Sequence, residues 1–170
     1  MTRGLAWLVA LVALAPPLPA LAQARAPRLS VRTIEELPLP LPASYDAHRD
    51  GRRDVAQALV RAGKSGKPLL VDLGANWCPG CRVLAGVLAL PEMRPWLSGH
   101  FEFVQVDIGR FDRNMDIASY FGVKAMSAVP AILVVDGKTR KLVNKDAVFG
   151  IGDIEQKPQV IANWLAKWAR

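Results

Sequence analysis

Cysteine, histidine and clustered charge are scarce in this chain, and each shortage excludes a class of site. The 170 residues include two cysteines and two histidines, His48 and His100. A structural zinc site takes four such ligands, and neither histidine stands at ligand spacing, so we expect no metal site. The 22 basic residues outnumber the 15 acidic ones, but they are scattered and no aromatic stacking platform accompanies them. Nucleic acid is therefore not an expected partner.

Long apolar runs are also few. The longest unbroken run covers residues 5–15 and follows Arg3. Three prolines and a small-x-small sequence at residues 20–22 come next, which is the pattern of a cleavable signal peptide. We expect residues 1–22 to be a signal peptide that sends the protein to the bacterial periplasm, where disulfide chemistry is possible. An uncleaved anchor is the alternative, and no later segment approaches the roughly 20 apolar residues that span a bilayer.

Both cysteines lie in one motif, Trp-Cys-Pro-Gly-Cys at residues 77–81. The apolar run at residues 68–75 before it is typical of a buried strand, and apolar residues at helical spacing follow it. Pro79 suits the first position of a helix. Cys78 should therefore be exposed at a helix N-terminus, where N–H groups stabilise a thiolate, with Cys81 about one turn further in. Two such thiols can exchange disulfides with a partner's sulfur, which needs no cofactor.

Asp72 is the one charged residue of the apolar run before the motif. Burial without a partner disfavours the charged form of a carboxyl group. We therefore expect its pKa to be raised, so that it exchanges a proton near neutral pH. The alternative is an aspartate near the end of the strand that reaches solvent.

The strand, the Trp-Cys-x-x-Cys motif at a helix start, and Val129-Pro130 before another apolar strand resemble the thioredoxin superfamily. The resemblance covers about residues 54–170. It implies an α/β fold of thioredoxin-like type, in which a mixed central β-sheet is flanked by helices. The order of predicted elements, β-α-β-α-β-β-α, agrees with that architecture.

The resemblance also implies roles for individual residues. Cys78 would be the nucleophile and Cys81 the resolving thiol. Asp72 stands six positions before Cys78, where thioredoxins carry a buried aspartate, and would help to deprotonate Cys81. The substrate-binding residues that it implies are Trp77, Val129 and Pro130, with a cis peptide before the proline.

The rest of the chain has the length of one domain. We expect a proline-rich N-terminal arm or linker over residues 23–45 and a thioredoxin-like domain over residues 46–170. The other helices are predicted from a cap at Asp54 to about Arg61, from a cap at Asp112 to Phe121, and from Pro158 onward. The other strands are predicted at residues 101–106, 131–135 and 142–149, the last two joined by an Asp-Gly hairpin turn at residues 136–137.

The sequence thus predicts an exported thiol-disulfide oxidoreductase acting on protein or peptide disulfides. The residues between the cysteines, Pro79 and Gly80, offer Cys78 no side-chain donor, so we expect a reductant or an isomerase-like exchanger rather than a strong oxidant. A membrane electron transducer would recycle it, and it would be a monomer. The alternatives are a non-catalytic module that binds a peptide or metal, a protein-disulfide oxidant, and an exported copper chaperone, for which a suitably placed histidine is lacking.

Overall fold

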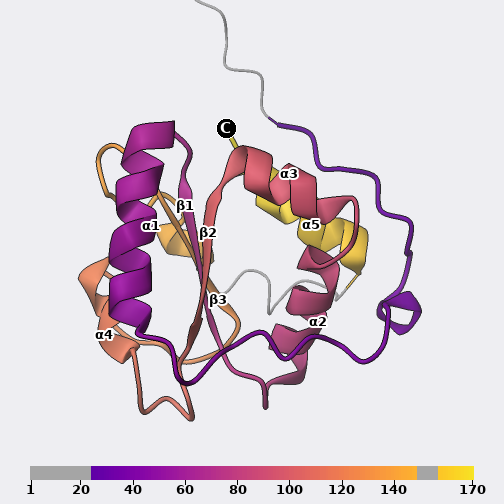
Figure 1. Cartoon of the computed structure of the whole chain (residues 1–170), viewed down its shortest axis with the longest axis horizontal. Coiled ribbons are helices and arrows are strands. Elements are labelled where there is room, and N and C mark those ends of the chain that lie inside the picture. Colours follow the sequence, from indigo (N-terminus) through magenta and orange to yellow (C-terminus); the bar gives the residue numbers. More distant parts are fainter. Residues whose placement is uncertain (1–23, 149–156) are drawn as a thin grey trace, which may run out of the picture.

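The computed structural model describes residues 24–148 and 157–170, so the predicted signal peptide lies outside the described residues (Figure 1). No helix within these two ranges is long and apolar enough to cross a membrane. The helices are α1 (Gly51–Ser65), α2 (Pro79–Leu88), α3 (Met93–His100), α4 (Met115–Tyr120) and α5 (Pro158–Ala166), with short 3-10 turns at Ile34–Glu36 and Lys145–Ala147. The strands are β1 (Leu69–Gly74), β2 (Glu102–Asp107) and β3 (Ala131–Val135).

The three strands form one mixed sheet in the order β2-β1-β3. The central strand β1 is parallel to β2 and antiparallel to β3. All six residues of β1 are buried, as expected of a strand covered on both faces. Because side chains alternate along a strand, Leu69 and Leu73 pack into one core cluster and Leu70 into the other. Asp72 therefore shares the sheet face of Leu70.

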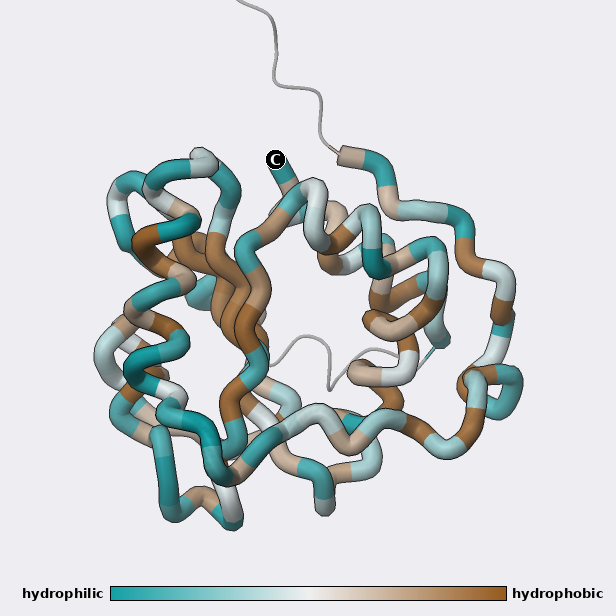
Figure 2. The backbone as a smooth tube through the Cα atoms, viewed as in Figure 1, coloured by the Kyte–Doolittle hydropathy of each residue, from teal (hydrophilic) through white to brown (hydrophobic). Residues whose placement is uncertain are grey.

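Helices cover both faces of the sheet (Figure 1). On one face α1 and α4 lie over the cluster that contains Leu69 and Leu73, and on the other α2, α3 and α5 lie over the cluster that contains Leu70. Figure 2 shows the strands between these layers as a mostly hydrophobic band. The predicted fold class, a mixed sheet flanked by helices, is confirmed, and Asp72 faces the α2 layer.

Residues 24–50, which we call the N-terminal arm, pack on the domain rather than extend from it. The arm passes along the outside of the α2, α3 and α5 layer and then crosses below the sheet to reach α1 (Figure 1). Leu29, Leu37 and Tyr45 are buried. Gln159 of α5 holds the start of the arm, because its side chain accepts from the Leu29 N–H at 3.0 Å and donates to the Pro27 carbonyl at 3.0 Å.

Both predicted aspartate caps are wrong. Helix α1 begins earlier than expected, because Asp50 is its N-cap and accepts from the Arg53 N–H at 3.1 Å. Asp54 instead pairs with Arg49 at 2.7 Å. Asp112 lies in the loop before α4, where its carboxylate accepts from the Arg110 N–H at 2.9 Å.

The predicted strand from residue 142 is also wrong, and its last residue, 149, lies outside the described residues. The chain does return beside β3 after the predicted turn, but the described residues pair irregularly: one bridge joins Val135 and Leu142, and the Val143 N–H donates to the Val134 carbonyl at 2.8 Å. The side chain of Asn144 then makes the hydrogen bonds to β3 that the backbone of a neighbouring strand would make. It accepts from the Val134 N–H at 2.8 Å and donates to the Ile132 carbonyl at 2.7 Å, so the regular ladder ends there.

Candidate active site

The two cysteines lie where β1 gives way to α2, as predicted. Cys78 is the N-cap of α2, and its Sγ accepts a hydrogen bond from the Cys81 N–H at 3.2 Å. Both cysteines are free thiols. Cys78 is only 6% exposed, so the expectation of an exposed thiol is wrong in degree: Tyr45 and Val129 pack against it. Cys81 is 0% exposed, and a reagent in solvent therefore meets Cys78 first.

Asp72 is fully buried on the sheet face that α2 covers. Its Oδ2 accepts from the Tyr45 hydroxyl at 2.8 Å and from the Gln105 amide at 3.0 Å, while its Oδ1 has no hydrogen-bond partner among the described residues. Burial raises the pKa of Asp72 to about 6, against the lowering effect of both hydrogen bonds. The carboxyl group can therefore take up or release a proton close to neutral pH, and it does not reach solvent as an aspartate at the strand end would.

Cys81 is the second group whose protonation the site controls. Burial raises the pKa of its thiol, and the hydrogen bond to Cys78 and the charge of Asp72 raise it further. Cys81 is therefore held as a neutral thiol, and it becomes a nucleophile only when a base takes its proton.

The Val129-Pro130 peptide lies against the thiols although it follows Cys78 by 51 residues in the sequence. It is cis, as the resemblance implied. The Cys78 thiol donates to the Val129 carbonyl at 3.5 Å, and the Val129 side chain packs against the cluster of Tyr45, Cys78 and Cys81. The structure thus brings Val129 and the buried Pro130 beside the cysteines, with the Val129 backbone next to the more exposed of the two sulfur atoms.

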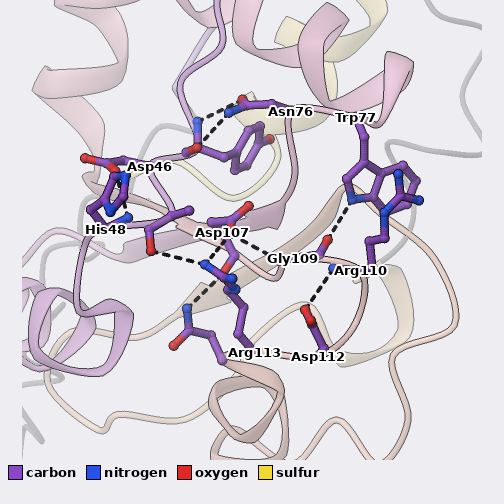
Figure 3. Close-up of polar contacts among 12 residues, drawn as sticks. Asp46, His48, Asn76, Trp77, Asp107, Gly109, Arg110, Asp112 and Arg113 are labelled. Atoms are coloured by element: carbon purple, nitrogen blue, oxygen red, sulfur yellow. Dashed lines mark hydrogen bonds and ion pairs between the residues drawn. The ribbon is translucent and has the colours of Figure 1, made fainter.

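Trp77 lies at the surface beside Cys78, with 45% of the residue exposed. Its indole N–H donates to the Gly109 carbonyl at 2.6 Å (Figure 3). The Phe111 ring lies 6.1 Å from the Trp77 ring, and the Arg110 guanidinium lies 5.8 Å from the Trp77 centroid. Arg110 and Phe111 were not predicted, because an aromatic residue in a polar loop has no periodicity that would assign it to a site.

An open groove of about 680 Å³ separates the N-terminal arm from the start of α2. Its apolar lining includes Leu39, Pro40 and Leu41 from the arm and Trp77, Pro79 and Val83 from the other side. Leu39 is 80% exposed, which is a high fraction for a leucine. The arm therefore forms one wall of a surface that adjoins Cys78, a role that its proline-rich sequence did not indicate.

Tyr45 is the other site residue that the sequence analysis missed. It lies in the arm, 27 positions before the aspartate whose Oδ2 it contacts. One signal was present: Gly74 interrupts an apolar strand, and a glycine there often marks the close approach of another group.

A metal-binding cluster was not expected, and among residues 24–148 and 157–170 no three His, Cys, Asp or Glu side chains are grouped to hold a metal ion.

Comparisons with known proteins agree with this geometry. Residues 50–137 match a family described as thioredoxin-like. The chain is 28% identical over 74 residues to a thioredoxin of Borreliella burgdorferi and 31% identical over 71 residues to one of Alicyclobacillus acidocaldarius. These alignments cover 44% and 42% of this chain, and the chain spans 58% and 60% of those two relatives.

A solved structure is similar over a larger part of the chain. It is described as a disulphide isomerase from Xylella fastidiosa Temecula1, with 31% sequence identity and a TM-score of 0.64. The similarity covers 75% of this chain and 97% of that protein. The resemblance drawn from the cysteine motif is confirmed, and the chain belongs to the thioredoxin-like family.

Proposed function

We propose that this protein is an exported thiol-disulfide oxidoreductase that exchanges disulfides of proteins or peptides through Cys78 and Cys81. The observation that carries the proposal is the asymmetry of the pair. Cys78 caps α2 and retains some exposure, whereas Cys81 is fully buried as a neutral thiol near a carboxyl group of raised pKa. The relatives named thioredoxin and the structure described as a disulphide isomerase support the same class of reaction.

The first step is attack by the Cys78 thiolate on one sulfur of a substrate disulfide. A bond forms between Cys78 and that sulfur, and the other substrate sulfur leaves as a thiolate that takes up a proton. The hydrogen bond from the Cys81 N–H at 3.2 Å and the positive end of the α2 dipole stabilise the attacking charge. Trp77, Val129 and Pro130 would form the surface on which the substrate segment rests.

The second step resolves the mixed disulfide. Asp72 accepts the proton of Cys81, and the resulting thiolate attacks the Sγ of Cys78. The second substrate sulfur leaves and takes up a proton, so the substrate has gained two electrons and two protons and Cys78 and Cys81 are joined by a disulfide. When a second thiol of the substrate attacks the mixed disulfide instead, the outcome is isomerisation without net redox change.

We further propose the reducing or isomerising direction. Pro79 and Gly80 place no hydrogen-bonding side chain between the cysteines to over-stabilise the Cys78 thiolate, and such stabilisation is what makes a dithiol strongly oxidising. A reductant in the periplasm needs electrons from a membrane transducer. The formal charge, +7 for the whole chain and +6 once Arg3 is removed with the signal peptide, favours its approach to an anionic surface. The protein would work as a monomer.

Trapping tests the reaction itself. Incubated with an oxidised protein substrate, the Cys81→Ser variant should accumulate a mixed disulfide at Cys78 that a reducing agent releases, because nothing remains to resolve it. The matched Cys78→Ser variant should accumulate none. If neither variant forms an adduct and the wild-type protein does not exchange disulfides, the chain is a binding module and the proposal is wrong.

A redox titration tests the direction. Equilibrated with glutathione, the pair should show a midpoint nearer to about −270 mV, as in thioredoxin, than to about −120 mV, as in a strong oxidant. A midpoint more positive than about −150 mV would identify a protein-disulfide oxidant instead.

A further inference from the structure

We infer that Tyr45 is a positioning residue for the resolving step: its hydroxyl fixes one oxygen of Asp72, so that the other oxygen alone is left to accept the Cys81 proton. The inference rests on the proposed role of Asp72 as a base. It assigns a function in the active site to the N-terminal arm, which contributes no thiol and lies outside the matched residues 50–137.

The contact itself is short and enclosed. Tyr45 is 2% exposed, and its hydroxyl donates to Asp72 Oδ2 at 2.8 Å. The same oxygen accepts from Gln105 at 3.0 Å, and within the part of the chain that the structure describes Oδ1 has no partner. The Tyr45 ring also packs in one cluster with Cys78 and Cys81. Tyr45 therefore touches both the carboxyl group and the thiols that are to exchange a proton.

The backbone of Tyr45 is held by the segment that leads into the cysteine motif. The Asn76 side chain accepts from the Tyr45 N–H at 3.2 Å and donates to the Tyr45 carbonyl at 2.7 Å. Four residues earlier in the arm, the Leu41 carbonyl accepts from the Arg82 guanidinium at 2.5 Å. These contacts hold the arm against the active-site loop and α2. They therefore fix the position from which the Tyr45 hydroxyl reaches Asp72.

The central strand leaves room for the ring. At Gly74, two residues after Asp72, an added Cβ would lie 2.6 Å from carbon atoms of the Tyr45 ring. Real Cβ atoms do not approach other atoms this closely, so any other residue at this position would push the ring away. The Tyr45 ring can therefore occupy its position only because residue 74 is glycine.

Among the described residues, no cationic side chain contacts the Asp72 carboxyl group. The groups that face it are Tyr45 from the arm, the neutral Gln105 from β2, Cys81 from α2 and, across β3, the apolar Ile132. Within residues 24–148 and 157–170, no Lys, Arg or His side chain pairs with Asp72. The charge of the carboxylate is therefore offset by two uncharged donors, of which Tyr45 has the shorter contact.

Removal of one of these donors should change the pKa of Asp72 in a known direction. A hydrogen bond to a carboxylate favours its charged form, so its loss raises the carboxyl pKa further above about 6. Asp72 can accept the Cys81 proton only when it is ionised. In a Tyr45→Phe variant, resolution should therefore need a higher pH, whereas a purely structural role of Tyr45 would slow resolution equally at every pH.

The test follows decay of a preformed mixed disulfide between Cys78 and glutathione, from about pH 5 to pH 9. In Tyr45→Phe the midpoint of the pH–rate profile should move upward by about one pH unit, the size expected for one hydrogen bond to a charged group. Tyr120→Phe is the matched control, because Tyr120 is the other tyrosine of the chain and is 68% exposed. Its profile should coincide with that of the wild-type protein.

A second measurement does not depend on turnover. The carbon NMR signal of the Asp72 carboxyl group should titrate at a higher pH in Tyr45→Phe, and to a smaller extent in Asn76→Ala, which loosens the arm but keeps the hydroxyl. The double variant Tyr45→Phe/Asp72→Asn should have the same pH–rate profile as Asp72→Asn alone, because the carboxyl group on which Tyr45 acts is absent from both.

An active Tyr45→Phe protein with the wild-type profile and carboxyl titration would overturn the inference and leave the proposed function intact. A wild-type protein that forms no mixed disulfide at Cys78 would instead contradict the proposed function.

Discussion

At the scale of single residues, the two thiols of one motif differ because their surroundings differ. Cys78 retains 6% exposure, and Cys81 is closed off at 0% with a raised thiol pKa. Brief treatment of the reduced protein with iodoacetamide should therefore label Cys78 first, since a thiolate that solvent can reach is the reactive form. Peptide mapping by mass spectrometry checks the order, and preferential label on Cys81 would reverse the assigned roles.

Asp72 allows a second prediction at this scale. Asp72→Asn is nearly isosteric and should leave the fold intact, but the amide cannot accept the Cys81 proton. We expect turnover at about pH 7 to 8 to fall by about a hundredfold, the lower end of the range for loss of a general base. Steady-state reduction of a protein disulfide measures the change, with Asp112→Asn in an exposed loop as the control. Equal rates for all three proteins would exclude a role for Asp72 in proton transfer.

At the scale of elements, the fit between β1 and the N-terminal arm depends on one missing side chain. Gly74→Ala would place a Cβ 2.6 Å from the Tyr45 ring. We expect it to lower the free energy of unfolding by about 1–3 kcal/mol, as overpacking of a filled core does. It should also make the arm more sensitive to limited proteolysis. Urea unfolding and cleavage within residues 24–50 are the two measurements.

Gly99→Ala is the matched control, since Gly99 lies in α3 and an added Cβ there meets nothing within 4 Å. Alanine is the better helix former, so this variant should be as stable as the wild-type protein or up to about 1 kcal/mol more stable. If Gly74→Ala behaved like Gly99→Ala, the arm would not be packed on β1 as described.

The same scale shows what local sequence can predict. The start of α2 at Pro79 and the bounds of β3 were predicted correctly, because each is determined by residues a few positions apart. The strand expected from residue 142 failed because one side chain, Asn144, makes the hydrogen bonds of a backbone. At the site, the motif and Asp72 were accessible from the sequence. The contact between Tyr45 and Asp72 was not, since no periodicity connects residues in different elements 27 positions apart.

At the scale of the whole molecule, Asp72 makes stability depend on pH. Its pKa rises from 3.8 in an unperturbed carboxyl to about 6 in the folded protein. The stabilising contribution of its protonated form is thus complete below 3.8 and is lost as pH rises through about 6, a loss of about 3 kcal/mol. Asp136 has the opposite sign, because hydrogen bonds lower its pKa to about 2, and it contributes little change above pH 4.

We therefore expect Asp72→Asn to be more stable than the wild-type protein at pH 8 and to lose that advantage towards pH 4. Urea unfolding at several values between about pH 4 and pH 8 measures the difference, in which the titration of the surface carboxyl groups common to both proteins cancels. Parallel curves for the two proteins across the window would mean that the pKa of Asp72 is the same in the folded and the unfolded state, and would contradict the raised value.

The course of the arm has a consequence for where this protein should be divided. The thioredoxin-like match begins at residue 50, five residues after Tyr45. A boundary drawn there keeps both thiols, Asp72 and the cis Val129-Pro130 peptide, and discards the hydroxyl that covers the carboxyl group. The region that matches the family therefore begins after a residue that contacts the Asp72 carboxyl group. Two proteins with identical cysteine motifs can accordingly differ in acid–base behaviour through a segment that alignments of the motif leave out.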